Sequence, residues 1–360
     1  MPSALSVLHA WWVRFFLRSH GTTPPISESW LGAAASPPGS SLAVSGISAD
    51  ESEVTLTAAK ERASVVVDLE LRARTLEELL QLQQIPALQS LAQGFLRAAA
   101  RADGSVDEVV ASVEKDPALC VRVLRMSNSA LIHPEQRIED ISTAVQMLGL
   151  RRVSTLAQAL FTMRDACNMT GGVDWRHLWV HALATAAIAD ELQQQLGCAT
   201  SPQLYLAALL HDVGKIVLST VEPDAYRAVL ADVWNEGACL DDLELLRFGV
   251  GHAEAGVVFG RHSGLPQEVV AAIAHHADPA QAEEHRLMVS LVTLANYFSK
   301  FYGLGFSGSC LEEGDVESLS AWAVLGEETG QSADVAQVAE EMRSFVGRLK
   351  PVLLGLREAV

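Results

Sequence analysis

The sequence predicts an all-α protein. Apolar residues recur at helical spacing along much of the chain, as at Val109, Val110 and Val113, and no strand-like alternation of comparable length is present. Helix starts are marked by capping residues, as at Ser201-Pro202, where a proline in the first turn sacrifices no hydrogen bond. We therefore expect helices throughout the folded part of the chain.

Residues 1–70 are expected to form a poorly ordered leader and linker. The stretch around Pro24-Pro25 is rich in proline, serine, glycine and alanine and has no helical periodicity, which is typical of disordered linkers. The aromatic segment Leu5–Leu17 is interpreted as part of a flexible leader, or as residues included only because the start codon is placed too far upstream. The alternative is that it lies on a membrane surface or docks a partner.

The folded part is predicted to have two helical lobes followed by closing helices. Residues 71–170 form a first lobe without a ligand cluster, and Thr75 with Glu78 matches a capping box at its first helix start. Residues 171–301 form a second lobe that holds eight of the eleven histidines. Residues 302–360 are expected to form C-terminal helices that pack on the second lobe.

Two short segments are expected to end helices. The run Lys215–Leu218 is interpreted as a helix end and loop rather than a strand. Asn128 is interpreted as a helix C-terminal cap, where asparagine readily adopts the left-handed conformation. The alternative for Asn128 is a polar group that binds a ligand or a partner backbone.

Composition limits the function classes. The chain has 360 residues, 49% hydrophobic, with 26 basic and 44 acidic residues and a net charge of −18, so a nucleic-acid partner is not expected. No apolar stretch reaches the roughly 18 residues of a transmembrane helix. The five cysteines are scattered, which favours buried free thiols in a reducing, cytoplasmic compartment over disulfides.

A group of histidines and one aspartate carries the chemistry. His211 and Asp212 are adjacent at the end of an apolar helix, and His181, His252 and His275 lie on other predicted helices. A metal ion needs ligands that converge from different helices, because one turn presents only two side chains on one face. Imidazole with carboxylate suits one or two ions of iron, manganese or zinc. Such ions lower the pKa of bound water, which points to phosphoester substrates.

Other residues near these ligands have two interpretations each. Lys215 could contact a phosphate as a point charge, or it could be a lysine favourably placed at a helix C-terminus. His177, His262 and His285 are expected to be ordinary packed histidines that donate to backbone carbonyls.

The chain resembles a known family at these positions. The run His211-Asp212-Val213-Gly214-Lys215, with histidines before and after it, is similar to the HD superfamily of metal-dependent phosphohydrolases. Motifs of the first lobe, among them Ile85-Pro86-Ala87-Leu88, are similar to the HDOD branch, and the resemblance covers about residues 85–301. It implies a bacterial, cytoplasmic, two-lobed helical signalling module in which phosphohydrolase activity has generally not been established.

The resemblance also implies a ligand set. Six residues fall on ligand positions of the related HD-GYP pattern, and the closing aspartate of that pattern falls on Asn296, a poorer ligand because it is neutral. The six are His181, His211, Asp212, His252, His275 and His276. Ala277-Asp278-Pro279 stands where active cyclic-dinucleotide phosphodiesterases continue toward a Gly-Tyr-Pro element, so hydrolysis of cyclic di-GMP is not expected.

Three functions are therefore considered. The favoured one is a signalling module that binds a protein partner and retains a metal site. The second is a metal-dependent phosphohydrolase, in which Asp212 and Lys215 would be catalytic. The third is a receptor for a nucleotide that is bound but not hydrolysed.

Overall fold

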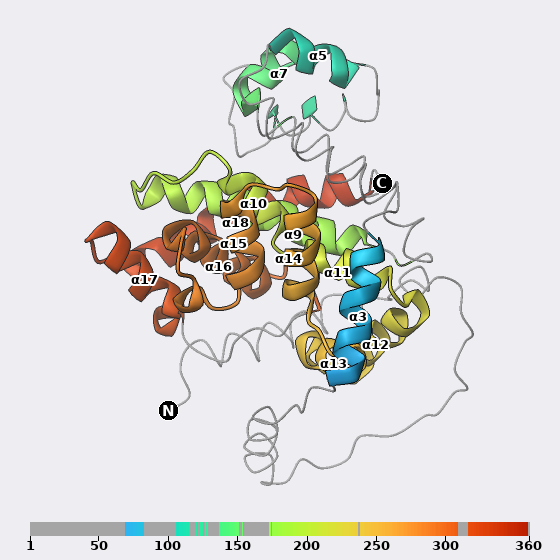
Figure 1. Cartoon of the computed structure of the whole chain (residues 1–360). Coiled ribbons are helices and arrows are strands. Elements are labelled where there is room, and N and C mark those ends of the chain that lie inside the picture. Colours follow the sequence, from blue (N-terminus) through green and yellow to red (C-terminus); the bar gives the residue numbers. More distant parts are fainter. Residues whose placement is uncertain are drawn as a thin grey trace, which may run out of the picture.

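The computed structural model describes the chain in six main segments and a few single positions. All regular elements of this described part are helices (Figure 1), which confirms the all-α prediction. The leader predicted over residues 1–70 lies outside the described residues up to residue 68. The described segments are residues 69–82, 106–114, 137–150, 175–236, 238–308 and 316–358, with single positions at 120, 123–124, 127–128, 153 and 173.

Helix α9 (Arg176–Gln195) is the central helix of the described part. It packs against α10 (Leu204–Leu210), α16 (Arg286–Phe301) and a C-terminal helix. Three of its alanines, Ala184, Ala186 and Ala189, are fully buried, and small side chains allow neighbouring helices to approach closely. The polar side chains of His181 and Thr185 on this helix are therefore buried in the core.

Six further elements surround this centre, and most of them are apolar on their inner faces. α11 packs against α14, α14 against α15, and α12 against α13. The bounds are α11 (Val213–Ser219), α12 (Pro223–Glu236), α13 (Leu240–Phe248), α14 (His252–His262), α15 (Gln267–His275) and the 3-10 turn η4 (Pro279–Gln281).

α11 corrects one prediction, because the run Lys215–Leu218 is helical and not a helix end and loop. All seven residues of α11 are buried, so the helix has no solvent-facing side and its sequence has no amphipathic period. α11 and α14 cross at two glycines. A Cβ built on Gly214 would lie 1.8 Å from the carbonyl oxygen of His252 and 2.6 Å from the backbone nitrogen of Gly256.

Helix α3 (Leu69–Leu82) packs against α13 and α14. Arg72 donates to the carbonyl oxygen of Gly249 and forms an ion pair with Glu254. Thr75 is buried within the helix, so the predicted capping box at this residue is wrong. Although α3 falls within the predicted first lobe, it contacts helices of the predicted second lobe, and the boundary between the lobes stays a prediction.

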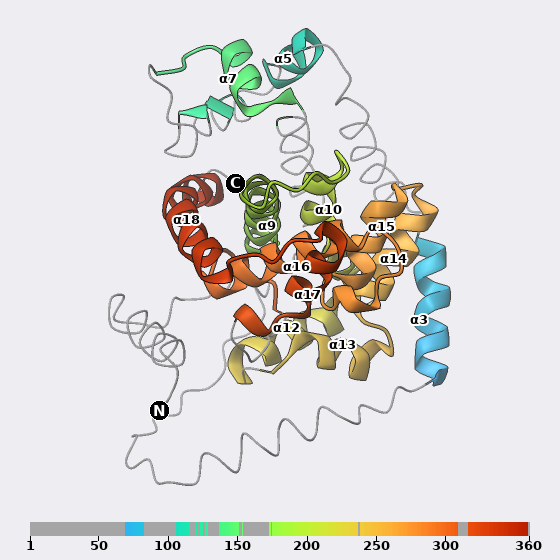
Figure 2. The ribbon, with the colours of Figure 1, turned by 90° about the vertical axis from the view of Figure 1, so that its left-hand side faces the viewer.

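Helices α5 (Val106–Glu114) and α7 (Ile141–Leu148) pack against each other, and both views place them above the remaining helices (Figures 1 and 2). The carboxylate of Asp140 caps α7 by accepting from the N–H of Thr143 at 2.7 Å. Asn128 is not left-handed. It still caps a carbonyl, because its backbone N–H and its side-chain amide both donate to Leu124, at 3.1 and 2.8 Å. The side-chain amide also pairs with the backbone N–H and carbonyl of Ile138, each at 2.7 Å.

The C-terminal segment contributes two helices. α17 (Ser320–Thr329) follows the short turn η5 (Val316–Ser318) and packs on α16, where Arg286 pairs with Glu327 and Glu328. α18 (Val335–Glu358) packs on α9, and Figure 2 shows the two helices beside one another.

Two predictions from composition can be compared with the described residues. Among them, no helix combines the length and the apolar character needed to cross a bilayer. Cys120, Cys198 and Cys239 are free thiols, but they are half-buried rather than buried. Cys167 and Cys310 lie outside the described residues.

Candidate metal centre

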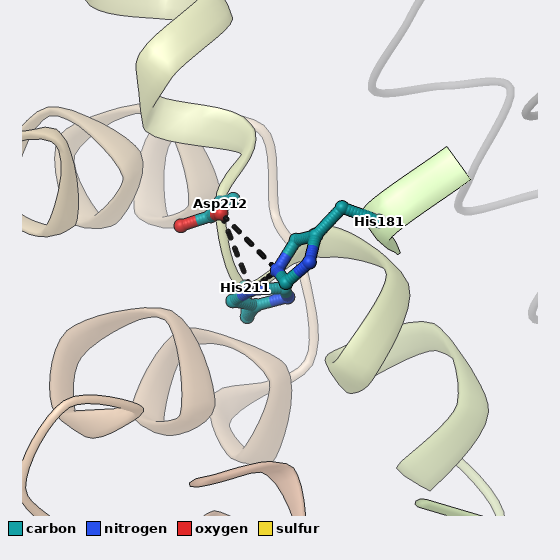
Figure 3. Close-up of side chains that lie close together, drawn as sticks. All are labelled: His181, His211 and Asp212. Carbon is teal, nitrogen blue, oxygen red and sulfur yellow. Dashed lines mark hydrogen bonds and ion pairs between the residues drawn. The ribbon is translucent and has the colours of Figure 1, made fainter. Parts of the chain in front are cut away.

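One oxygen of Asp212 faces a pair of histidines. The apolar helix α10 ends at Leu210, so His211 and Asp212 lie in the turn that leads into α11. His181 reaches the same point from α9 (Figure 3). Asp212 Oδ2 lies 3.3 Å from His211 Nε2 and 3.8 Å from His181 Nε2, and the two nitrogens are 3.3 Å apart.

The other oxygen of Asp212 faces a second pair. His252 is the first residue of α14, and His276 follows the last residue of α15. Asp212 Oδ1 lies 3.4 Å from His252 Nε2 and 3.6 Å from His276 Nε2, and these nitrogens are 3.4 Å apart. The carboxylate is therefore shared between two histidine pairs, and each pair with Asp212 forms a set of three converging donor atoms.

The backbone fixes which ring nitrogen faces Asp212. His211 Nδ1 lies 2.7 Å from the carbonyl oxygen of Ala208, and His276 Nδ1 lies 3.0 Å from that of Ile273. A carbonyl oxygen only accepts, so each Nδ1 must carry the hydrogen. The Nε2 lone pairs are then directed toward Asp212, which is how metal-binding histidines are commonly held.

Electrostatics give Asp212 and two of the four rings the charge state that a cation needs. Burial, together with the nearby ring of His211, lowers the pKa of His181 and of His276 well below the usual value, so both rings are neutral. Burial alone would raise the pKa of Asp212, but the Lys215 ammonium and the His211 ring hold it well below its usual value. Neutral imidazoles around an ionised carboxylate are the donor set of a divalent transition-metal site.

Lys215 is fully buried beside the cluster. Its Nζ lies 2.8 Å from Asp212 Oδ2 and donates to the carbonyl oxygen of Ser307 at 2.8 Å. Lys215 belongs to the first turn of α11, so its interpretation as a lysine at a helix C-terminus is wrong. The segment after α16 that supplies Ser307 also contacts α9, where the N–H of Phe306 donates to the carbonyl of His177.

The two other predicted ligands are His275, which does not join the described His/Asp donor groups, and Asn296, which stays a prediction. His275 is half-buried and lies in the wall of a separate open cavity of about 710 Å³, together with Arg261 and His285. Asn296 is 5% exposed on α16, and its Oδ1 accepts no hydrogen bond within the described part. A buried carbonyl oxygen of this kind is costly, and a cation or a ligand N–H would satisfy it.

The histidines expected to be ordinary also lie outside the donor groups. His262 is exposed, and its Nδ1 lies 3.0 Å from the carbonyl oxygen of Val258. His285 is exposed and left-handed, with φ of 57°, and His177 is half-buried.

Sequence reasoning missed an acidic layer behind His252. Glu244 Oε2 lies 2.7 Å from His252 Nδ1, and Asp241 Oδ1 lies 3.4 Å from the same nitrogen. The pKa of Asp241 is lowered to about 2 and the pKa of His252 is raised. Burial raises the pKa of Asp241 but the His252 ring lowers it, while burial lowers the pKa of His252 but Glu244 raises it. Only the burial of Glu244 marks it as special, and a sequence does not reveal burial.

Fold and donor set together define an all-helical protein with a buried His/Asp cluster of the kind found in metal-binding proteins. The family model for the HDOD domain matches residues 85–279, which is more than half of the chain. The chain therefore belongs to the HDOD family, as the motifs in the sequence indicated.

Solved structures share this fold. An HDOD domain protein of unknown function from Geobacter sulfurreducens has a TM-score of 0.64 and 23% identity, covering 81% of this chain and 99% of its own. A protein from Marinobacter aquaeolei, provisionally named a signal transduction protein, has a TM-score of 0.59 and 22% identity, covering 82% and 67%. A protein from Shewanella amazonensis, provisionally named a phosphohydrolase, has a TM-score of 0.53 and 22% identity, covering 79% and 98%.

One curated relative is an uncharacterized protein of Treponema pallidum. It is 28% identical over 222 residues, which cover 61% of this chain and 43% of that protein. The chain thus matches less than half the length of that relative.

Proposed function

We propose that this HDOD protein is a signalling module that acts by binding a protein partner and that holds one or two divalent transition-metal ions. The observation that carries the proposal is the division of Asp212 between two histidine pairs. His181 and His211 with Oδ2 would hold one ion, and His252 and His276 with Oδ1 would hold another. Iron, manganese and zinc all accept this donor set.

Burial supports a structural or sensory role for the metal over hydrolysis. The five side chains of the cluster are each at most 4% exposed, so a phosphoester would need the helices to move before it reached them. The cation that would contact a phosphate, Lys215, is instead bound to Asp212. A metal held in this way would stabilise the helices that supply its ligands, and a partner would bind the surface of those helices.

We expect protein purified without chelators to contain about one or two iron, manganese or zinc ions per chain, because each histidine pair with Asp212 offers three converging donor atoms. Elemental mass spectrometry measures this content. The Asp212→Ala variant should lose the metal, whereas His262→Ala, which removes an exposed imidazole outside the cluster, should keep it. Metal-free wild-type protein, or equal metal in all three proteins, would contradict the proposal.

A phosphohydrolase is the second candidate, and the contact between Asp212 and Lys215 favours it. The ammonium is close enough to the cluster to neutralise a phosphate after rearrangement. A bound metal ion would act as a Lewis acid toward the phosphoryl group. The third candidate is a receptor that binds a nucleotide without cleaving it. Isothermal titration with nucleotides, cyclic dinucleotides and generic phosphodiesters tests it.

Under the favoured function, metal-loaded protein is expected to hydrolyse none of a panel of nucleotides, cyclic dinucleotides and generic phosphodiesters faster than Asp212→Ala does. Product release followed by chromatography measures the rates. The Lys215→Met variant separates the two candidates. If the wild type hydrolyses a compound and Lys215→Met keeps its metal but loses this activity, the phosphohydrolase is the correct function and the binding module is not.

A further inference from the structure

Glu244 is a fully buried carboxylate with partners on both oxygens. Oε2 accepts from the backbone N–H of His252 at 2.8 Å and lies 2.7 Å from its ring Nδ1. Oε1 accepts from the hydroxyl of Tyr226 at 2.6 Å. Charged side chains are almost never fully buried unless they are paired, so this position of Glu244 requires an explanation.

The position of His252 in its helix explains why a side chain is needed there. His211 and His276 each donate from Nδ1 to a carbonyl three residues earlier in the chain, within the turn that precedes them. His252 is the first residue of α14, so no turn of its own helix precedes it. Glu244, from α13, supplies the acceptor that the backbone supplies to the other two rings.

Tyr226 holds the carboxylate from the opposite side. Its ring is fully buried and lies 5.9 Å from the ring of Trp175 and 5.8 Å from that of Phe248. Burial and the Glu244 carboxylate raise the pKa of Tyr226 well above its usual value, so the phenol keeps its proton and donates it. Asp241 is 3.4 Å from His252 Nδ1 and half-exposed, which leaves Glu244 as the shorter contact.

We infer that Glu244, held by Tyr226, is the positioning residue of the metal centre, fixing the ring of His252 so that Nε2 faces Asp212. The inference rests on the proposed metal site. The carboxylate keeps the hydrogen on Nδ1 and, through its charge, makes Nε2 a better donor, as carboxylate partners of metal-binding histidines generally do. Neither Glu244 nor Tyr226 is one of the five proposed metal ligands, so both would act through His252.

Zinc affinity of the full-length protein, measured by competition with a chelator, tests the inference. Glu244→Met has a similar length but no acceptor, and it should weaken zinc binding by about 10–100-fold. Glu244→Gln retains an oxygen but no charge, so its loss should be smaller. Asp242→Asn removes a negative charge from the same helix without touching His252, and it should bind zinc like the wild type.

The protonation of the imidazole nitrogens provides a readout that a merely structural role would not change. In nitrogen-15 spectra of metal-free protein, at a pH where the rings are neutral, His252 should carry its hydrogen on Nδ1. Glu244→Met should change this pattern for His252 only, because His211 and His276 depend on backbone carbonyls. Spectra and zinc affinity that match the wild type would overturn the inference.

The outcomes separate the inference from the proposal on which it rests. Wild-type protein that binds no zinc would remove the metal site, whereas the spectra of the metal-free protein would still decide whether Glu244 sets the ring of His252. If Glu244→Met does not fold, Glu244→Gln and Tyr226→Phe replace it. Wild-type affinity in both of these variants would then overturn the inference, and a loss in Glu244→Gln larger than in Tyr226→Phe would support it.

Discussion

Replacing Asp212 with alanine is expected to abolish metal binding and to lower the free energy of unfolding of the metal-free protein by about 3–5 kcal/mol. The carboxylate lies 2.8 Å from the ammonium of Lys215, and both groups are buried. Without it the ammonium remains in the core and loses this ion pair. Removing one partner of a buried ion pair is costly because the other charge has lost its water without compensation.

Urea unfolding in the presence of a chelator measures this loss separately from the contribution of the metal. The double variant Asp212→Ala with Lys215→Met removes both charges, and it should recover a large part of the stability while still binding no metal. Stability of Asp212→Ala equal to that of the wild type would show that the ion pair does not stabilise the core. Metal retained by Asp212→Ala would show that the ligands lie elsewhere.

The sequence was sufficient to predict which side chains would form most of the cluster. Adjacent residues at a helix end, His211 and Asp212, project into the same turn, and His181 and His252 stand among small or apolar residues that indicate burial. The spacing of these residues along the chain required separate helices to bring them together. The all-α class followed from the same periodicity, and the structure confirms it.

In the doublet His275-His276, helical periodicity could have predicted which of the two histidines joins the cluster. Successive residues of a helix point about 100° apart, so both rings cannot face the same site. The buried face of α15 includes Val269, Ala272 and Ile273. His276 lies seven, four and three residues after them, so it continues the same face. His275 falls beside this face, in the wall of the open cavity.

Other features depend on tertiary contacts that no local pattern encodes. α11 is buried along its whole length, and even Lys215 lies in the core, so the amphipathic period that normally identifies a helix is absent. Thr75 and Glu78 match a capping box, yet they lie inside α3, which begins at Leu69. In the sequence, nothing distinguishes Glu244 from other helical glutamates, because its contact with His252 depends on the packing of α13 against the start of α14.

Replacing Gly214 with alanine is expected to lower the free energy of unfolding by about 3 kcal/mol, at the upper end of the range for overpacked cores. The added Cβ would lie 1.8 Å from the carbonyl oxygen of His252 and 2.6 Å from the nitrogen of Gly256. Both contacts are backbone atoms, so no side-chain rotation relieves them. α11 and α14 must separate, and because α14 begins at His252, we expect metal affinity to fall as well.

Gly347→Ala is the matched control for this substitution. Gly347 is an exposed residue within α18, and a Cβ there would meet no atom within 4 Å. Since alanine favours helices over glycine by roughly 0.5–1 kcal/mol, this variant should be slightly more stable and should bind metal like the wild type. Urea unfolding and chelator competition on both variants measure the two effects. If Gly214→Ala were as stable as Gly347→Ala, α11 and α14 could not be packed as closely as described, and the close contact of His252 with Asp212 would lose its support.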